Sequence, residues 1–318
     1  MGIKKWLICL FLVILGVSGR VSAGEPDRFV KDRFIFVGEF QKKPIITTVE
    51  FSRGYTEKVR NRYSAKFRGH FLFAGKWHQL KNCVFEESAE LNSEKLKKTP
   101  EFEPCILVWD EEQKKGAINY DREEISFLLQ FKDLTILDNE GPRDCFKIQT
   151  GTAQAFLLFQ GKNIPGKLFY QRFDLKDYNP FVNNFNHLKR KNLQQFFLVS
   201  ASGNAYIIWK ELEGSKIRGQ WICHDKFITL VEQGKPLVSS RRLDLEILAT
   251  RSENNPESKF RTYPVAWKIN KSFSEIGELD FLLRSEDYFY WFGYGLFSVE
   301  GTVNNEKVFG LAEVIRGN

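Results

Sequence analysis

The sequence has little of what metal and nucleophile chemistry requires. It holds four histidines, five cysteines and one methionine among 318 residues. The spacings HxH, HExxH and CxxC do not occur, so we expect no metal site. A GxSxG nucleophile signature and a glycine-rich phosphate loop before a helix do not occur either. We therefore expect no hydrolase triad, no nucleotide site and no cofactor.

The sequence also lacks a strong excess of either charge. Its formal charge is +7, and three of its 47 basic residues, Lys4, Lys5 and Arg20, lie in the first 23 positions. The rest of the chain keeps 44 basic residues against 40 acidic ones. An excess this small favours solubility and not binding to a polyanion. We expect no nucleic-acid partner.

Only one long apolar run occurs, and it lies at the N-terminus. Residues 6–17 form twelve consecutive apolar or small positions after Lys4 and Lys5, and Val21-Ser-Ala supplies the small residues of a cleavage site. This pattern is typical of a secretory signal over residues 1–23. The run is short for a membrane-spanning helix, which needs about 20 apolar residues; an uncleaved anchor is the alternative. We expect a periplasmic or secreted protein with no integral membrane segment after cleavage.

Export would place the remaining cysteines in an oxidising compartment. Cys9 leaves with the signal, and Cys83, Cys105, Cys145 and Cys223 remain, which allows three pairings. Cys83 and Cys105 flank a polar segment, so we favour a bridge there, which would stabilise the fold by about 3 kcal/mol. Four free thiols are the alternative, since cysteine is often a small core residue.

Apolar residues recur at a period of two along most of the chain. The segments with this pattern are short, rich in aromatic and β-branched residues, and bounded by Gly, Asn or Pro. They cover residues 34–40, 45–51, 63–73, 125–131, 155–159, 167–173, 205–209, 220–230, 243–248, 265–269, 295–299 and 307–314. The pattern predicts an all-β protein. A dozen or more strands exceed one open sheet, so we expect barrels or sandwiches.

An internal repeat suggests two similar β domains. Residues 155–173 align without gaps with residues 295–313, and each copy reads as two strands joined by a turn, with Pro165-Gly166 and Asn304-Asn305 as turn formers. A second repeat relates residues 34–37 to residues 196–199. We place the boundary in the polar stretch near residue 190. The predicted domains are residues 24–188 and residues 189–318.

The end of the sequence resembles a known family. The motifs are Tyr290-Trp-Phe-Gly, Val299-Glu-Gly and Gly310-Leu-Ala-Glu-Val-Ile-Arg-Gly, with an aromatic strand upstream that contains Trp267. They resemble the terminal signature of the lipocalin-like family of carotenoid 1,2-hydratase (hydroxyneurosporene synthase) and AttH-like proteins. Its members consist of two consecutive lipocalin-like barrels. The resemblance implies two tandem lipocalin-like antiparallel β-barrels. This chain has Phe292 where the family carries a carboxylate.

The resemblance also implies a chemistry on isoprenoid or polycyclic apolar substrates, either water addition to an alkene or cyclisation. Such a reaction needs a partly desolvated acid and aromatic faces that stabilise a cation. Glu313 is the candidate acid, with Glu300 and Asp280 as further carboxylates. Glu313 alternates with apolar neighbours on its strand, so the alternative is that it points to solvent or closes a barrel end.

Four aromatic residues are candidates for contact with a ligand: Trp209, Trp267, Tyr290 and Trp291. The alternative is that they fill the core. We predict an exported protein that binds a lipid or isoprenoid-like molecule in a barrel or at the domain junction. A hydratase or cyclase is the first alternative, and a structural envelope protein with filled barrels is the second. A cavity with aromatic walls and a buried carboxylate would favour the enzyme, and the same cavity without the acid would favour a carrier.

Overall fold

The structure is a computed structural model of the chain. It describes residues 28–56, 62–88, 103–110, 112–122, 124–143, 146–176, 193–211, 215–217, 220–222, 226–230, 237–239, 243–255, 258–291 and 294–315. Every regular element in these ranges is a β-strand, so none of the described segments is a helix that could cross a membrane. The signal expected over residues 1–23 and the boundary expected at residues 188–189 both lie outside the described residues.

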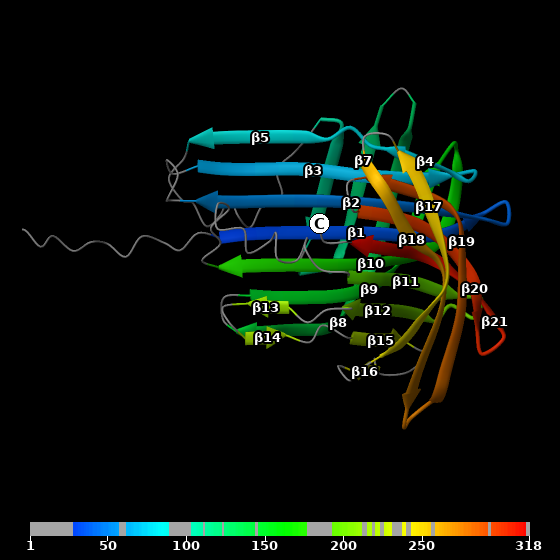
Figure 1. The fold of residues 1–318 in the computed structure, drawn as a ribbon. Helices are drawn as coiled ribbons and strands as arrows, with labels where there is room; N and C mark the ends of the chain where they lie inside the picture. Colours follow the sequence, from blue (N-terminus) through cyan, green and yellow to red (C-terminus); the bar gives the residue numbers. More distant parts are fainter. Residues whose placement is uncertain are drawn as a thin grey trace, which may run out of the picture.

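The first sheet is built from residues 28–176 and curls over on itself. Figure 1 shows β7 crossing β1–β3 at a steep angle. All pairings between neighbouring strands are antiparallel. In spatial order the strands are β4 (Lys76–Gln79), β3 (Arg62–Phe73), β2 (Lys43–Thr56), β1 (Arg28–Phe40), β10 (Lys162–Lys176), β9 (Phe146–Phe159), β8 (Ser126–Arg143), β7 (Lys115–Asp121) and β6 (Cys105–Asp110), while β5 (Cys83–Ser88) also pairs with β3.

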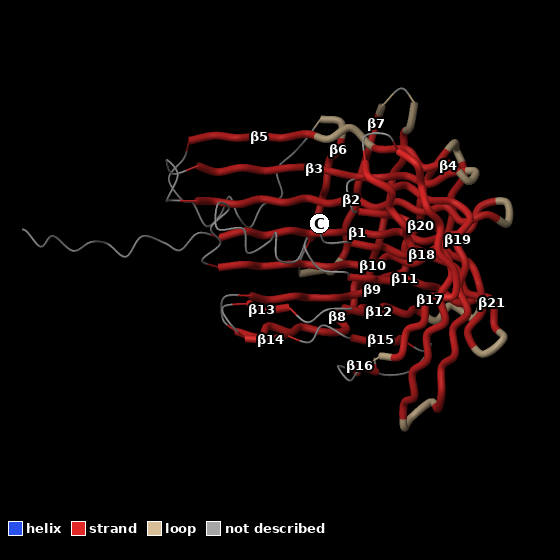
Figure 2. The backbone as a smooth tube through the Cα atoms, viewed as in Figure 1, coloured by secondary structure: helices blue, strands red, loops and turns tan. Residues whose placement is uncertain are grey.

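The second sheet is built from residues 193–315 and is also antiparallel throughout. Its spatial order is β16 (Leu237–Ser239), β15 (Lys226–Leu230), β12 (Ala205–Glu211), β11 (Leu193–Ser200), β21 (Glu306–Ile315), β20 (Tyr294–Val303), β19 (Gly277–Trp291), β18 (Ser258–Phe273) and β17 (Asp244–Asn255). A separate small hairpin joins β13 (Ser215–Ile217) to β14 (Gln220–Ile222). In Figure 2 the strands of the second sheet lie beside those of the first sheet.

The two sheets follow the same path. In each, the first long strand lies in the middle, between the second strand and the last one: β1 lies between β2 and β10, and β11 lies between β12 and β21. The next strands lead to one edge of the sheet, and the chain then continues at the opposite edge and returns to the central strand through successive hairpins. The repeat between residues 34–37 and 196–199 falls on β1 and β11, which occupy equivalent places. The prediction of an all-β fold with two tandem antiparallel units is confirmed.

The two segments of the longer repeat do form equivalent hairpins, β9–β10 and β20–β21, in the two sheets, but their predicted alignment is wrong. The β9–β10 turn lies at Gln160-Gly161, and the β20–β21 turn at Asn304-Asn305. All four residues have positive φ, as two-residue hairpins of type I′ require. Equivalent turns are therefore 144 positions apart and not 140. Pro165 instead lies inside β10, just beyond the last residue of β10 that pairs with β1, where a missing N–H is tolerated.

Gly166, next to that proline, has a packing role and not a turn role. A Cβ placed there would lie 2.4 Å from the carbonyl oxygen of Val37 on β1. Only glycine permits this close approach of the two strands. Gly166 is therefore required for the packing of β10 against β1, although the Pro165-Gly166 pair is a sequence pattern typical of a turn.

Three apolar layers hold the molecule together. One fills the concave side of the first sheet, around Phe34, Phe51 and Phe71. Another fills the concave side of the second sheet, around Trp267 and Phe297. A third lies between the sheets and takes residues from both. Strands β1 and β11 are therefore covered on both faces, which explains their near-continuous apolar sequences.

Candidate functional site

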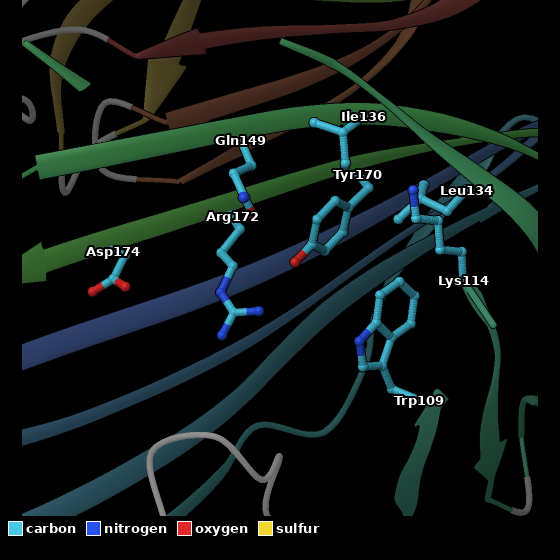
Figure 3. Close-up of a pocket in the computed structure, with 8 residues that line it drawn as sticks. All are labelled: Trp109, Lys114, Leu134, Ile136, Gln149, Tyr170, Arg172 and Asp174. Carbon is cyan, nitrogen blue, oxygen red and sulfur yellow. The ribbon is translucent and has the colours of Figure 1, made fainter. Parts of the chain in front are cut away.

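A cavity of about 390 Å³ opens on the concave side of the first sheet. Figure 3 shows the eight residues that line it: Trp109, Lys114, Leu134, Ile136, Gln149, Tyr170, Arg172 and Asp174. They come from β6, the turn before β7, and strands β8, β9 and β10. Tyr170, Arg172 and Asp174 alternate along β10, so the strand period places all three on one face.

One wall of the cavity is aromatic. The rings of Trp109 and Tyr170 stack, with centroids 5.7 Å apart and planes at 17°. Phe34 packs against both, at 6.0 Å from Trp109 and 5.2 Å from Tyr170, and Phe131 lies 5.4 Å from Trp109. Such contacts hold the rings in fixed orientations. The wall is therefore a rigid, flat surface that an apolar molecule can cover.

Behind this wall lies a buried ion cluster centred on Asp32. Arg53 Nη1 donates to Asp32 Oδ2 at 2.7 Å, and the Tyr170 hydroxyl donates to Oδ1 at 2.7 Å. Arg172 Nε lies 3.7 Å from Oδ1. The Asp32 and Arg53 side chains are only 6% and 1% exposed. Burial, together with the Asp32 charge, raises the pKa of Tyr170, so the hydroxyl stays protonated and remains a donor.

The cavity lining carries more positive than negative charge. Among the described residues of the lining, Arg172 and Lys114 are cationic and Asp174 is the one anion. Figure 3 shows the Arg172 guanidinium directed into the same space as the Tyr170 hydroxyl and the Trp109 ring. The site thus combines a flat apolar wall with cationic groups beside it.

Glu313, the predicted catalytic acid, is buried but does not reach this cavity. It lies on β21, on the face directed at the first sheet, and accepts a hydrogen bond from Arg33 Nη1 of β1. Only 3% of the residue is exposed. The solvent-facing alternative is therefore wrong. Glu313 is an ion-paired carboxylate at the domain junction, with the Tyr294 hydroxyl also hydrogen-bonded to it.

The predicted ligand-contacting aromatics do not form one site. Trp209 belongs to the layer between the sheets, where it stacks on Phe173 with centroids 6.4 Å apart. Trp267 lies in the core of the second sheet, and its Nε1 donates to Gln194 Oε1 at 2.8 Å. The two tryptophans lie on opposite faces of the second sheet. Tyr290 and Trp291 belong to β19, but their side chains lie outside the described residues.

The predicted Cys83–Cys105 bridge is not formed. Both residues are free thiols in the structure. The Cys83 thiol points to the carbonyl oxygen of Glu103 at 3.3 Å, while Cys105 is buried in the first core. Burial raises the pKa of the Cys105 thiol, and the neighbouring Cys83 raises it further. Cys145 and Cys223 lie outside the described residues.

Metal ligands do not gather in the part of the chain that the structure describes, where no three His, Cys, Asp or Glu residues come together. His70 and His78 do lie on one hairpin that turns at Ala74-Gly75. His78 is opposite Phe71, however, while His70 is opposite Gln79. Adjacent register positions point to opposite faces, so the two imidazoles cannot share an ion.

Sequence reasoning missed the residues that form the cavity. Asp32 and Tyr170 are 138 positions apart, and only the β1–β10 pairing brings them together. The available signal was the placement of Asp32 and Arg33 inside the apolar run of residues 29–37, because charged residues in a buried strand need partners. The partners themselves could not be deduced without the register.

Comparisons with known proteins support the fold. Of the solved structures, that of a protein assigned as AttH from Nitrosomonas europaea superposes with a TM-score of 0.60 at 11% sequence identity, over 92% of this chain and 93% of that one. Two structures of CghA give TM-scores of 0.48 and 0.47 at 11% and 13% identity, over 91% of this chain and 89% and 88% of those chains. No protein-family profile and no curated protein sequence matches the chain. The first likeness identifies an AttH-type, lipocalin-like fold.

Proposed function

We propose that the protein binds a lipophilic small molecule in the cavity of the first sheet. The observation that carries this proposal is the cavity itself, about 390 Å³ in volume and walled by the stacked Trp109 and Tyr170 rings. Ligand pockets are commonly of about 300–1,000 Å³, with mostly apolar walls and a few placed polar groups. This cavity lies within that size range, and its lining is divided between an apolar part, formed by Trp109, Leu134, Ile136 and the Tyr170 ring, and a polar part.

The distribution of charge suggests how the ligand is oriented. Its apolar body would lie against Trp109, Leu134 and Ile136, and its polar or acidic end near Arg172 and Lys114. A carboxylate there would form charge-assisted hydrogen bonds, which are about twice as strong as neutral ones. The proposed ligand is therefore an amphiphile, such as a fatty acid or an oxidised isoprenoid.

The state of the carboxylates favours binding over catalysis. Asp32 borders the cavity, but both of its oxygens already accept hydrogen bonds, from Arg53 and Tyr170. Glu313 is paired with Arg33 outside the cavity. Protonation of an alkene needs a desolvated carboxylic acid directed at the substrate, and neither residue has that geometry. Asp174, which lines the cavity, is only half-buried and stays in contact with water. Kinship with carotenoid 1,2-hydratase stays a prediction from the terminal motifs.

The third hypothesis, a structural protein with filled barrels, describes the second sheet better than the first. Trp267 is fully buried there and is held between Phe196 and Phe297. The first sheet has open space beside an aromatic wall. The second sheet also has a pocket, of about 440 Å³, but its described lining has no aromatic residue and is mostly polar: Lys210, Leu243, Asp244, Leu245, Glu246, Lys268 and Asn270. We therefore assign ligand binding to the first sheet and a supporting role to the second.

Fluorescence titration tests the proposal. The full chain, without its predicted signal, would be titrated with cis-parinaric acid, a fluorescent polyunsaturated fatty acid. We expect saturable binding and a loss of about tenfold or more in affinity for Trp109→Ala, because a large apolar contact is removed. Phe156→Ala is the matched control, because Phe156 is 40% exposed on the outer face of the same sheet. Equal affinities for both variants, or no saturable binding, would refute the proposal.

A further inference from the structure

The junction between the two sheets contains two facing rows of polar residues. On the first sheet the row is Glu50, Arg33, Gln171 and Thr150, which are register partners across β2, β1, β10 and β9. On the second sheet the row is Glu313, Gln195 and Trp209, across β21, β11 and β12. Arg33 Nη1 joins the rows by hydrogen bonds to Glu313 and Gln195. The junction also contains apolar residues of both sheets and the half-buried His70, whose ring packs against Phe289.

Several buried polar atoms in these rows have no hydrogen-bond partner among the described residues. They are Arg33 Nη2, both polar atoms of the Gln171 amide, Thr150 Oγ1 and Trp209 Nε1. Gln171 and Thr150 are 0% exposed, and Arg33 and Trp209 are 5% exposed. Buried polar side chains in native proteins nearly always have a partner. The Gln171 amide, with neither atom paired, and the adjacent Thr150 hydroxyl, which is also unpaired, are exceptions to this rule among the described residues.

Aromatic contacts on either side of Gln171 separate it from solvent. Its neighbours on the same face of β10 are Phe169 and Phe173. Phe169 packs on Phe197 with centroids 5.7 Å apart, and Phe173 stacks on Trp209 at 6.4 Å. The unpaired atoms are therefore enclosed between the sheets and are not in contact with bulk water. This junction is distinct from the cavity lined by Trp109 and Tyr170, which lies on the other face of β10.

The charges and the donors define the chemistry of the guest. Arg33 is paired with Glu313, and Lys31 with Glu50 at 2.9 Å. Lys167, which is buried on the same face of β10, also has an interaction partner, so these described charges do not require an added ion. Arg33, Gln171 and Trp209 all offer N–H donors, while the Gln171 carbonyl is the one unpaired atom that can only accept. The guest must therefore be neutral and must present oxygen as an acceptor.

We propose that the domain junction is a binding site for a neutral, oxygen-bearing guest, held by Gln171, Thr150, Trp209 and Arg33. A carbonyl or hydroxyl group of a small molecule presents the required oxygen, and so does an ordered water molecule. The guest completes the hydrogen bonding of the junction and thereby couples its own binding to the docking of the two sheets. Its presence is independent of any ligand in the first-sheet cavity.

A matched pair of threonine variants tests the proposal. Thr150 and Thr152 lie on the same face of β9 and are both buried, but Thr152 Oγ1 donates to the Leu168 carbonyl at 2.8 Å. Thr→Val keeps the shape and removes the hydroxyl. We expect Thr150→Val and Gln171→Met each to lower the Tm by about 2 °C or more, which is the loss that we also expect for the hydrogen-bonded reference Thr152→Val. If both leave the Tm unchanged or raise it, their polar atoms have no guest, and the proposal is wrong.

Two measurements on the unmodified protein identify the guest and remain informative if a variant fails to fold. Native mass spectrometry would show an added mass for a small molecule and none for water. A crystal structure at high resolution would show density between Gln171 and Trp209 in either case. An added mass that Trp209→Phe reduces at least twofold supports a small molecule, because that change removes one donor and keeps the ring. A junction without density would overturn the proposal.

Discussion

Arg33 and Glu313 lie 280 residues apart and form one buried ion pair between the two sheets. Burial lowers the pKa of the Arg33 guanidinium, but the charge of Glu313, its hydrogen bond to Arg33 and the nearby Tyr294 and Glu50 together outweigh this effect, and the net pKa is raised. Arg33 therefore stays charged in the interior. The Arg33 side chain also lies over the Phe197 ring at 5.6 Å. The pair fixes the position of β21 against β1, at the centre of the domain junction.

Breaking this ion pair should destabilise the protein strongly. Glu313→Gln keeps the shape of the side chain but leaves the Arg33 charge uncompensated, and we expect a loss of about 3–5 kcal/mol in the free energy of unfolding. Urea unfolding followed by tryptophan fluorescence measures it. Glu39→Gln is the control: Glu39 pairs with Lys307 at 2.7 Å, but both side chains are substantially exposed, so its loss should not exceed about 1 kcal/mol. Losses of equal size would contradict the prediction.

His70 should make the junction sensitive to acid. Burial, and then the charge of Arg33, lower the pKa of its imidazole from 6.5 to about 4. Glu50 acts in the opposite direction, and Arg68 in the same direction as Arg33. Between these two pKa values the unfolded chain binds a proton that the folded chain does not, so stability is full above pH 6.5 and falls as the pH drops towards 4.

His70→Phe tests this dependence, because it keeps a ring against Phe289, which lies 4.8 Å from the imidazole. We expect the free energy of unfolding of this variant to fall less than that of the parent between pH 6.5 and 4. Urea unfolding at a series of pH values measures the difference. Identical slopes for the two proteins would mean that His70 does not contribute.

Tyr170 should contribute to stability as well as to the cavity wall. Tyr170→Phe keeps the stacking on Trp109 but removes the hydroxyl that donates to Asp32 at 2.7 Å. A hydrogen bond to a charged group is worth about 1.5–3 kcal/mol, and we expect a loss of that size by urea unfolding. Tyr120→Phe removes a hydroxyl that only accepts from the Lys81 backbone N–H at 3.1 Å and should cost less. The reverse order would contradict the assignment.

Arg172 should determine the preference for an acidic ligand. If the carboxylate of a bound amphiphile lies near the guanidinium, Arg172→Gln should lower the affinity for cis-parinaric acid by about tenfold and leave that for its methyl ester nearly unchanged. Lys162→Gln is the control, because Lys162 is an exposed cation at the start of the same strand. Equal losses for acid and ester would show that the headgroup lies elsewhere, even if the cavity binds the apolar body.

Export is a prediction from the sequence that N-terminal sequencing can check. Expression of the whole chain in a secreting host should yield a mature protein that begins at Gly24, after the small residues Val21-Ser-Ala. A product that retains Met1 in the membrane fraction would indicate an anchor in place of a cleaved signal.

The strand pattern could be predicted from the sequence because alternation is a local property. Nearly all of the predicted segments coincide with strands; residues 220–230 contain two, β14 and β15, with residues 223–225 outside the described part. The sequence predicted the β9–β10 turn at the wrong position, because Pro165-Gly166 is a strong turn signal and Gln160-Gly161 is a weaker one. Here strand pairing overrode local propensity.

The site could not be predicted in the same way, because its residues meet only through long-range register. Glu313 alternates between two apolar neighbours, a pattern that usually places a carboxylate in solvent. The second face of β21 is instead covered by the first sheet, so the charge is buried and paired. Trp109 and Tyr170 had no distinguishing signal among the many aromatic residues, and only the curl of the sheet brings them into contact.

The central position of β1 and β11 has a consequence for biosynthesis. Each strand is made first in its sheet, yet one of its two neighbours, β10 or β21, is made last. An apolar strand edge therefore stays open until more than a hundred further residues have been added, a topology that folds slowly and exposes the nascent chain to aggregation. A product terminated before β21 would keep that edge of β11 open and would depend on a chaperone to remain soluble.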